Sequence, residues 1–152
     1  MKIQKLSRRK QREFAFQVLY SLNFNSETEL NLLKENAACF PDSKKENFSP
    51  EQAPFAWELI EGVEEKKSEL DSYIEKYSRN WKINRIAKIE LTILRLATFE
   101  LIFRPDIPPK VSINEAIELA KGYGDINSKT FVNGILDALA KDITNGQLGN
   151  SK

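Results

Sequence analysis

The chain has 152 residues, of which 41% are hydrophobic and 30% are charged, and its formal net charge is +1. This composition is typical of one folded domain with a hydrophobic core, and the length leaves no room for a binding domain beside a large catalytic one. The single cysteine, Cys39, and the absence of histidine exclude an internal disulfide, the usual zinc ligand and any nucleophile pair that depends on histidine.

The N-terminus is strongly basic. Its first twelve positions hold six basic residues and no acidic one: Lys2, Lys5, Arg8, Arg9, Lys10 and Arg12. Phe14, Val18 and Leu22 then recur at i, i+4 and i+8, which predicts a helix from about Arg8 to Asn23 with the cations on its first turns. Such an arm can neutralise phosphates and release their counterions, so it favours binding to RNA or DNA. The alternative is a solubilising terminus, the usual fate of terminal charge runs.

Capping boxes predict the next helices. In a capping box, a serine and a Glu or Gln three residues later each satisfy an unpaired backbone donor. Ser26 with Glu29 opens a weak helix, and a polar loop follows it at 41–47. Ser49 with Gln52 opens another helix, which continues or restarts after the glycine at position 62.

Residues 86–103 contain twelve apolar residues out of eighteen, a density that raises the question of a membrane span. The charged side chains of Lys88, Glu90, Arg95 and Glu100 argue against a span and favour the central helix of a soluble bundle. Glu90 and Glu100 project from the apolar side of this helix and need partners. The sequence leaves open whether those partners lie inside the bundle or on another chain.

Two more helices complete the chain. Prolines within 104–109 end the central helix, and Ser112 with Glu115 forms a capping box for the next one. Gly122 or Gly124 is expected to end that helix in a left-handed conformation.

The last helix carries Phe131, Ile135 and Leu139, and Asn127 or Ser128 is its expected N-cap. No alternating strand followed by a hairpin turn is present. The predicted fold class is therefore all-α.

Catalytic signatures are missing from the sequence. Gly122-Tyr123-Gly124 lacks the third glycine and the preceding strand of a dinucleotide fingerprint, and there is neither a P-loop nor a metal-ligand spacing. We therefore expect no enzymatic activity, no cofactor and no metal site. With no apolar signal-like stretch behind the basic arm, we expect a cytoplasmic protein.

Four blocks of sequence occur in one order: RRKQREFAFQVLY at 8–20, ILRLATFEL at 93–101, VSINEAIELAK at 111–121 and FVNGILD at 131–137. Together they resemble the bacterial NusB family of transcription antitermination factors. The segment 25–81 matches that family only in helical character.

The resemblance implies two small helical bundles packed across each other, about 1–80 and about 81–145. The Gly- and Asn-rich sequence beyond Asp142 predicts a frayed tail at 146–152. It implies binding to the boxA element of nascent ribosomal RNA leader transcripts. It also implies a heterodimer with NusE, the ribosomal small-subunit protein that doubles as a transcription factor, and entry into an antitermination complex on RNA polymerase. No membrane contact is implied, and the free protein is left open as a monomer or a homodimer.

The resemblance also assigns residues. RNA contacts fall on the basic block and on the loop before the last helix, at Arg8, Arg9, Lys10, Arg12, Asn127, Ser128, Lys129 and Phe131. For Phe131, a core position is at least as well supported as stacking on a base. Glu90 and, more weakly, Tyr20 fall on the NusE side.

The chain departs from the family pattern before the last helix. The family's Asp-Ser-His-Lys-Phe is Asn-Ser-Lys-Thr-Phe at 127–131, which moves the lysine by one position, about 100° around a helix. Two alternative functions remain. One is a helical scaffold that binds acidic protein, and the other is a non-catalytic RNA-binding module of the kind attached to RNA cytosine methyltransferases.

Overall fold

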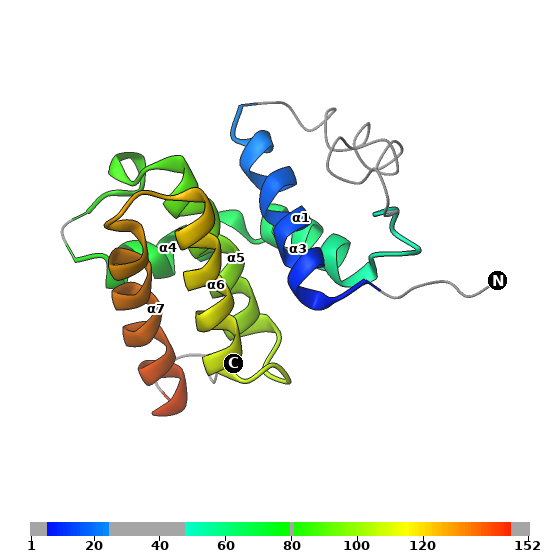
Figure 1. The fold of residues 1–152 in the computed structure, drawn as a ribbon. Coiled ribbons are helices and arrows are strands. Elements are labelled where there is room, and N and C mark those ends of the chain that lie inside the picture. Colours follow the sequence, from blue (N-terminus) through cyan, green and yellow to red (C-terminus); the bar gives the residue numbers. More distant parts are fainter. Residues whose placement is uncertain (1–5, 25–47, 80, 147–152) are drawn as a thin grey trace. The chain divides into compact units, whose positions relative to one another are not determined.

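The computed structural model describes residues 6–24, 48–79 and 81–146 (Figure 1). These residues form helices and no strand, so the all-α prediction is confirmed. The weak helix expected after Ser26, the loop at 41–47 and the tail from 147 onward lie outside the described residues. No described helix is both long enough and apolar enough to cross a membrane.

The chain forms two compact units, Met1–Gly62 and Val63–Lys152. The division falls inside α3 (Pro54–Glu65), whereas the predicted division lies near residue 80. We describe each unit by itself.

In the first unit, α1 (Arg8–Leu22) and α3 (Pro54–Glu65) pack side by side (Figure 1). The hydroxyl of Ser7 caps α1 by accepting a hydrogen bond from the backbone N of Lys10 at 3.1 Å. The helix therefore matches its predicted extent to within one residue.

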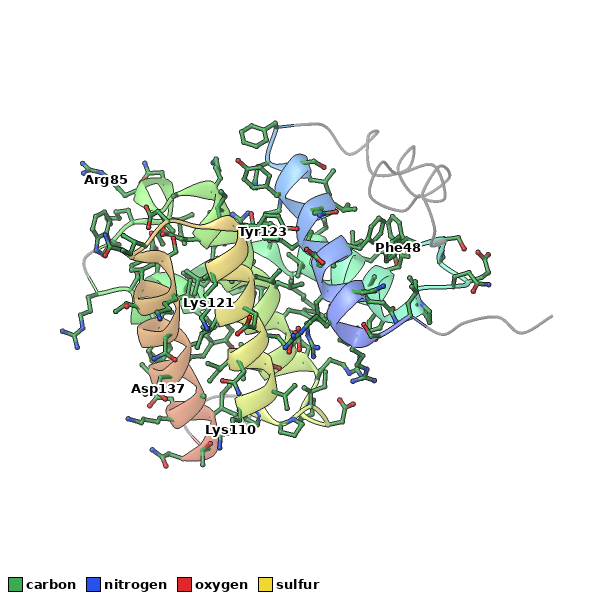
Figure 2. The ribbon with its side chains drawn as sticks, in the orientation of Figure 1. Phe48, Arg85, Lys110, Lys121, Tyr123 and Asp137 are labelled. Carbon is green, nitrogen blue, oxygen red and sulfur yellow. The ribbon has the colours of Figure 1, made fainter. Side chains whose placement is uncertain are left out.

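Three aromatic rings form the centre of this unit. The ring of Phe14 stacks on Phe48 at 4.5 Å and meets Trp57 edge-on at 5.8 Å. Figure 2 shows Phe48 beside α3, where its carbonyl accepts a hydrogen bond from Trp57 Nε1 at 2.7 Å. Ring packing and a satisfied indole N–H thus fix α1 against α3.

The predicted capping box at Ser49 and Gln52 is wrong. The Ser49 carbonyl instead accepts hydrogen bonds from the backbone N of Gln52 and of Ala53, at 3.0 and 2.8 Å, so this segment is a turn. The helix begins at Pro54, where a missing N–H costs nothing and the fixed φ is already helical.

The second unit contains α4 (Lys67–Tyr77), the short 3₁₀ helix η3 (Ile83–Arg85), α5 (Lys88–Phe103), α6 (Pro109–Tyr123) and α7 (Ser128–Thr144). The helices α4, α5 and α7 pack against one another, and α6 packs against α5 and α7 (Figure 1). Central α5 is buried on most of its faces, which explains its apolar density. The expected restart of the preceding helix occurs at Lys66 rather than directly after Gly62.

Charged side chains of α5 find partners inside this unit. Arg95 forms a two-point ion pair with Asp71 of α4, with N–O distances of 2.8 and 2.9 Å. Glu100, although fully buried, accepts a hydrogen bond from the Ser112 hydroxyl at 2.9 Å. Glu100 is therefore paired internally.

The predicted start of α6 is wrong, whereas its predicted end at Gly124 is confirmed in position but not in conformation. The helix begins at Pro109, so Ser112 lies within it and bonds Glu100 instead of capping it. At the other end Gly124 has φ −95°, which is not left-handed. A Cβ at Gly124 would instead lie 2.4 Å from Ser128 Oγ, so glycine is needed there for close approach.

Candidate nucleic-acid interface

The basic residues of α1 differ in exposure. Arg8, Arg9 and Lys10 are exposed, whereas Arg12 is only 4% exposed. All four were predicted to contact RNA. The structure separates three surface cations from one that is packed behind them.

The ring of Phe55 explains where two of these cations lie. The guanidinium carbon of Arg8 is 4.5 Å from the ring centroid and that of Arg12 is 5.1 Å from it. Attraction between a cation and an aromatic face stabilises such an arrangement, more strongly when water is excluded. Phe55, at the start of α3, therefore positions the basic turn of α1.

Gln11 fastens the same turn. Its Nε2 donates to the Leu6 carbonyl at 3.0 Å, and its Oε1 accepts from the backbone N of Ala56 at 3.0 Å. That N–H is one of the first amides of α3, which have no partner within their own helix. The basic turn thus lies at the N-terminus of α3, where the helix dipole adds positive potential.

Neither Gln11 nor Phe55 was predicted as a site-forming residue from the sequence. The helical spacing could have predicted the burial of Gln11. This residue precedes Phe14 by three positions and Val18 by seven, so it lies on the same buried face of the helix. Phe55 carried no such signal, since its contacts with the arginines join distant parts of the chain.

The loop before α7 is held by Ser128, which is 1% exposed. Its hydroxyl accepts from the backbone N of Asp125 at 2.9 Å and lies 2.6 Å from Glu90 Oε2, to which it donates. Asp125 Oδ1 accepts from the backbone N of Asn127 at 2.9 Å. The hydroxyl of Ser128 therefore makes its hydrogen bonds within the protein.

Asn127 occupies the N-cap position of α7, as one of the two predicted alternatives. Its side chain makes no capping hydrogen bond, so the expected capping by its oxygen is wrong. The side chains of Asn127, at the end of this loop, and of Lys129, in the first turn of α7, are exposed. The loop and the basic turn of α1 belong to different units.

Phe131 lies in the first turn of α7 and is partly exposed. Its ring meets the ring of Trp81 edge-on, with centroids 6.4 Å apart and an interplanar angle of 80°. Trp81 is 51% exposed. The pairing of Phe131 with a solvent-facing indole was not anticipated, although one aromatic residue among the charges of 79–85 is itself unusual.

The two residues expected on the partner side have different surroundings. Tyr20 is half-buried in α1, between Phe16 at 6.0 Å and the exposed Phe24 at 5.4 Å. Glu90 lies in the first turn of α5 and accepts the hydrogen bond from Ser128. The partner of Glu90 in the folded chain is therefore internal.

The profile of the NusB family matches residues 9–141. The transcription antitermination protein NusB of Nitratidesulfovibrio vulgaris is 49% identical over 142 residues, which cover 93% of each chain. The protein of the same name from Myxococcus xanthus is 45% identical over 134 residues, covering 88% of this chain and 94% of the relative.

Solved structures agree with these matches. NusB of T. maritima superposes with a TM-score of 0.78 at 38% identity, covering 91% of this chain and 94% of that one. A crystal structure of the antitermination factors NusB and NusE with dsRNA gives a TM-score of 0.68 at 30% identity, covering 88% and 96%. The chain belongs to the NusB family.

Proposed function

We propose that this chain is a transcription antitermination factor that binds the boxA element of ribosomal RNA leader transcripts together with NusE. The pair then joins an antitermination complex on RNA polymerase. Family membership and the names of the relatives support this function, as does the similar NusB structure with NusE and dsRNA. The chain acts by binding, without catalysis, in the cytoplasm where bacterial transcription takes place.

One observation carries the RNA part of the proposal. Three exposed cations, Arg8, Arg9 and Lys10, stand on a first helical turn that Gln11 and Phe55 hold in place. Cations on a rigid turn lose little conformational entropy when they contact phosphate, so they bind better than cations on a flexible terminus. The buried Arg12 supports this turn through the contact of its guanidinium group with the ring of Phe55.

The start of α7 supplies a second RNA contact. Asn127 and Lys129 present exposed side chains there, and the first amides of a helix suit a phosphate oxygen. Ser128 contributes by fixing the loop through Glu90 and Asp125. Phe131 offers its partly exposed ring to a base.

NusE binds through the residues assigned to it, Tyr20 and Glu90. The exposed ring of Phe24 next to Tyr20 adds apolar area to that contact. The carboxylate of Glu90 accepts from Ser128 through Oε2, which leaves Oε1 to accept a hydrogen bond from a partner.

The test is binding of a boxA-containing RNA and of a scrambled RNA across a range of salt concentrations. We expect selective binding of boxA, with log Kd rising linearly with log salt. Arg9→Ala should lower that slope by about 0.7, because one phosphate contact of a single strand is lost. Lys141→Ala is the matched control, since it removes an exposed lysine near the other end of α7. An unchanged slope for Arg9→Ala would remove Arg9 from the interface, and equal affinity for the two RNAs would contradict the proposed function.

A further inference from the structure

A solvent-open depression of about 480 Å³ lies at the C-terminal end of α4. It is lined by Ser72, Glu75, Lys76, Arg79, Trp81 and Lys82. None of these residues belongs to the RNA contacts proposed above. Three of them are cations and only one is a carboxylate, so the depression favours an anionic ligand.

The carboxylate of Glu75 is engaged by the backbone and forms no ion pair with Arg79 or Lys82. Glu75 Oε2 accepts a hydrogen bond from the backbone N of Ile83 at 3.1 Å, which ties the segment after Trp81 to α4. Arg79 and Lys82 are exposed, and no carboxylate among the described residues forms an ion pair with either of them. Their charge is therefore available to a phosphate group.

The indole of Trp81 is exposed on a backbone that is fixed. The buried Ser78 donates its hydroxyl to the Trp81 carbonyl at 2.8 Å, and its own carbonyl accepts from the backbone N of Trp81 at 3.3 Å. The edge of Phe131 supports the ring from the side. A half-exposed aromatic ring on a hydrogen-bonded backbone is a platform on which a nucleic-acid base can stack.

The remaining cation that lines the depression is Lys76. Lys76 Nζ lies 5.4 Å from the ring centroid of Tyr77, at the end of α4. Arg85, in η3, lies three positions after Lys82 in the sequence, and Figure 2 shows its side chain projecting away from the ribbon. An exposed aromatic ring among several cations is typical of surfaces that bind single-stranded nucleic acid.

We propose that this depression is a subsite for one nucleotide of single-stranded RNA, whose base stacks on Trp81 and whose phosphate is bound by Arg79 and Lys82. The inference rests on the proposed function, because the contact between Trp81 and Phe131 connects the depression to the RNA-binding start of α7. An RNA strand that passes over the ring of Phe131 next reaches the indole of Trp81. The RNA contact is thereby extended from α7 to the end of α4.

Affinity measurements with a boxA RNA carrying single-stranded flanks test the subsite. Trp81→Ala should weaken binding roughly tenfold, within the range for loss of one stacked base, whereas Trp81→Phe should retain most of the affinity. Lys82→Gln should lower the slope of log Kd against log salt by about 0.7, the value for one phosphate contact of a single strand. Lys141→Gln, far along α7, should leave the slope unchanged.

Tryptophan fluorescence of the unmodified protein gives an independent measurement. Because no residue is substituted, misfolding of a variant cannot explain its result. Trp57 is 3% exposed and Trp81 is 51% exposed, so acrylamide should quench mainly Trp81 before RNA is added. Bound RNA should protect Trp81 and lower the quenching constant. Quenching that RNA does not change, or equal affinities of Trp81→Ala and Trp81→Phe, would overturn the subsite.

The two proposals fail in different ways. Failure of the unmodified chain to distinguish boxA from scrambled RNA would overturn the proposed function and the subsite with it. Selective boxA binding that Arg9→Ala weakens and Trp81→Ala leaves intact would overturn the subsite alone.

Discussion

Neighbouring arginines on one helix have different physical roles in this protein. Arg9 is an exposed cation, whereas Arg12 is buried with its guanidinium over the ring of Phe55. The aliphatic part of a buried arginine packs like an apolar side chain, so its removal costs stability as well as charge. Counting charges in the sequence cannot make this distinction.

Substitution of these two arginines should separate the roles. We expect Arg12→Ala to lower the free energy of unfolding by about 1–2 kcal/mol, because it removes packing and a shielded cation–aromatic contact. Arg9→Ala should change it by less than about 0.5 kcal/mol, as is usual for surface positions. Urea unfolding followed by circular dichroism measures both. Equal stability of the two variants would show that Arg12 does not support the basic turn.

At the scale of whole helices, the sequence predicted which helices exist better than where they begin. Hydrophobic spacing identified α1, α5 and α7 because their buried faces repeat with the helical period. The predicted starts at Ser49 and Ser112 were wrong because the capping spacing is a local rule. Proline at the first helical position fixed the observed starts instead.

A tyrosine links the C-terminal ends of two of these helices. The hydroxyl of Tyr77 in α4 donates a hydrogen bond to Asp142 in α7. Burial, that hydrogen bond and the negative charge of Asp142 together raise the pKa of Tyr77 from 10.0 to about 12. The folded protein thus holds this proton more tightly than the unfolded chain does.

This pKa shift predicts a dependence of stability on pH. A raised folded-state pKa gives stability that is complete below about pH 10 and is lost as the pH rises toward 12. Tyr77→Phe should therefore be less stable than the unmodified protein at neutral pH, by about 1 kcal/mol. The difference should disappear near pH 12. Thermal unfolding of both proteins at several pH values measures it, and a constant difference across this range would contradict the assigned hydrogen bond.

At the scale of the whole molecule, fold class and family followed from the sequence, because helical periodicity and four short blocks are local patterns. Contacts between distant segments did not follow. Gln11 with Ala56, Trp81 with Phe131 and Ser128 with Glu90 each depend on how the helices pack. The basic arm could therefore be predicted, but not the residues that hold it or the exposed indole.

The Ser128–Glu90 hydrogen bond joins a residue of the proposed RNA loop to one proposed to contact NusE. Two sites that share a hydrogen bond can influence each other, and such coupling is reciprocal in free energy. We predict that this coupling is positive, so that NusE binds the RNA-bound chain more tightly than the free chain, by the same factor by which NusE tightens RNA binding.

The most direct measurement is the affinity of the unmodified chain for boxA RNA, with and without saturating NusE, beside a scrambled RNA of equal length. We predict that the chain prefers boxA and that NusE raises the boxA affinity by about 5- to 150-fold, a coupling of about 1–3 kcal/mol. Glu90→Ala should reduce that gain while leaving the affinity measured without NusE less affected. The same affinity for both RNAs in the presence of NusE would contradict the account.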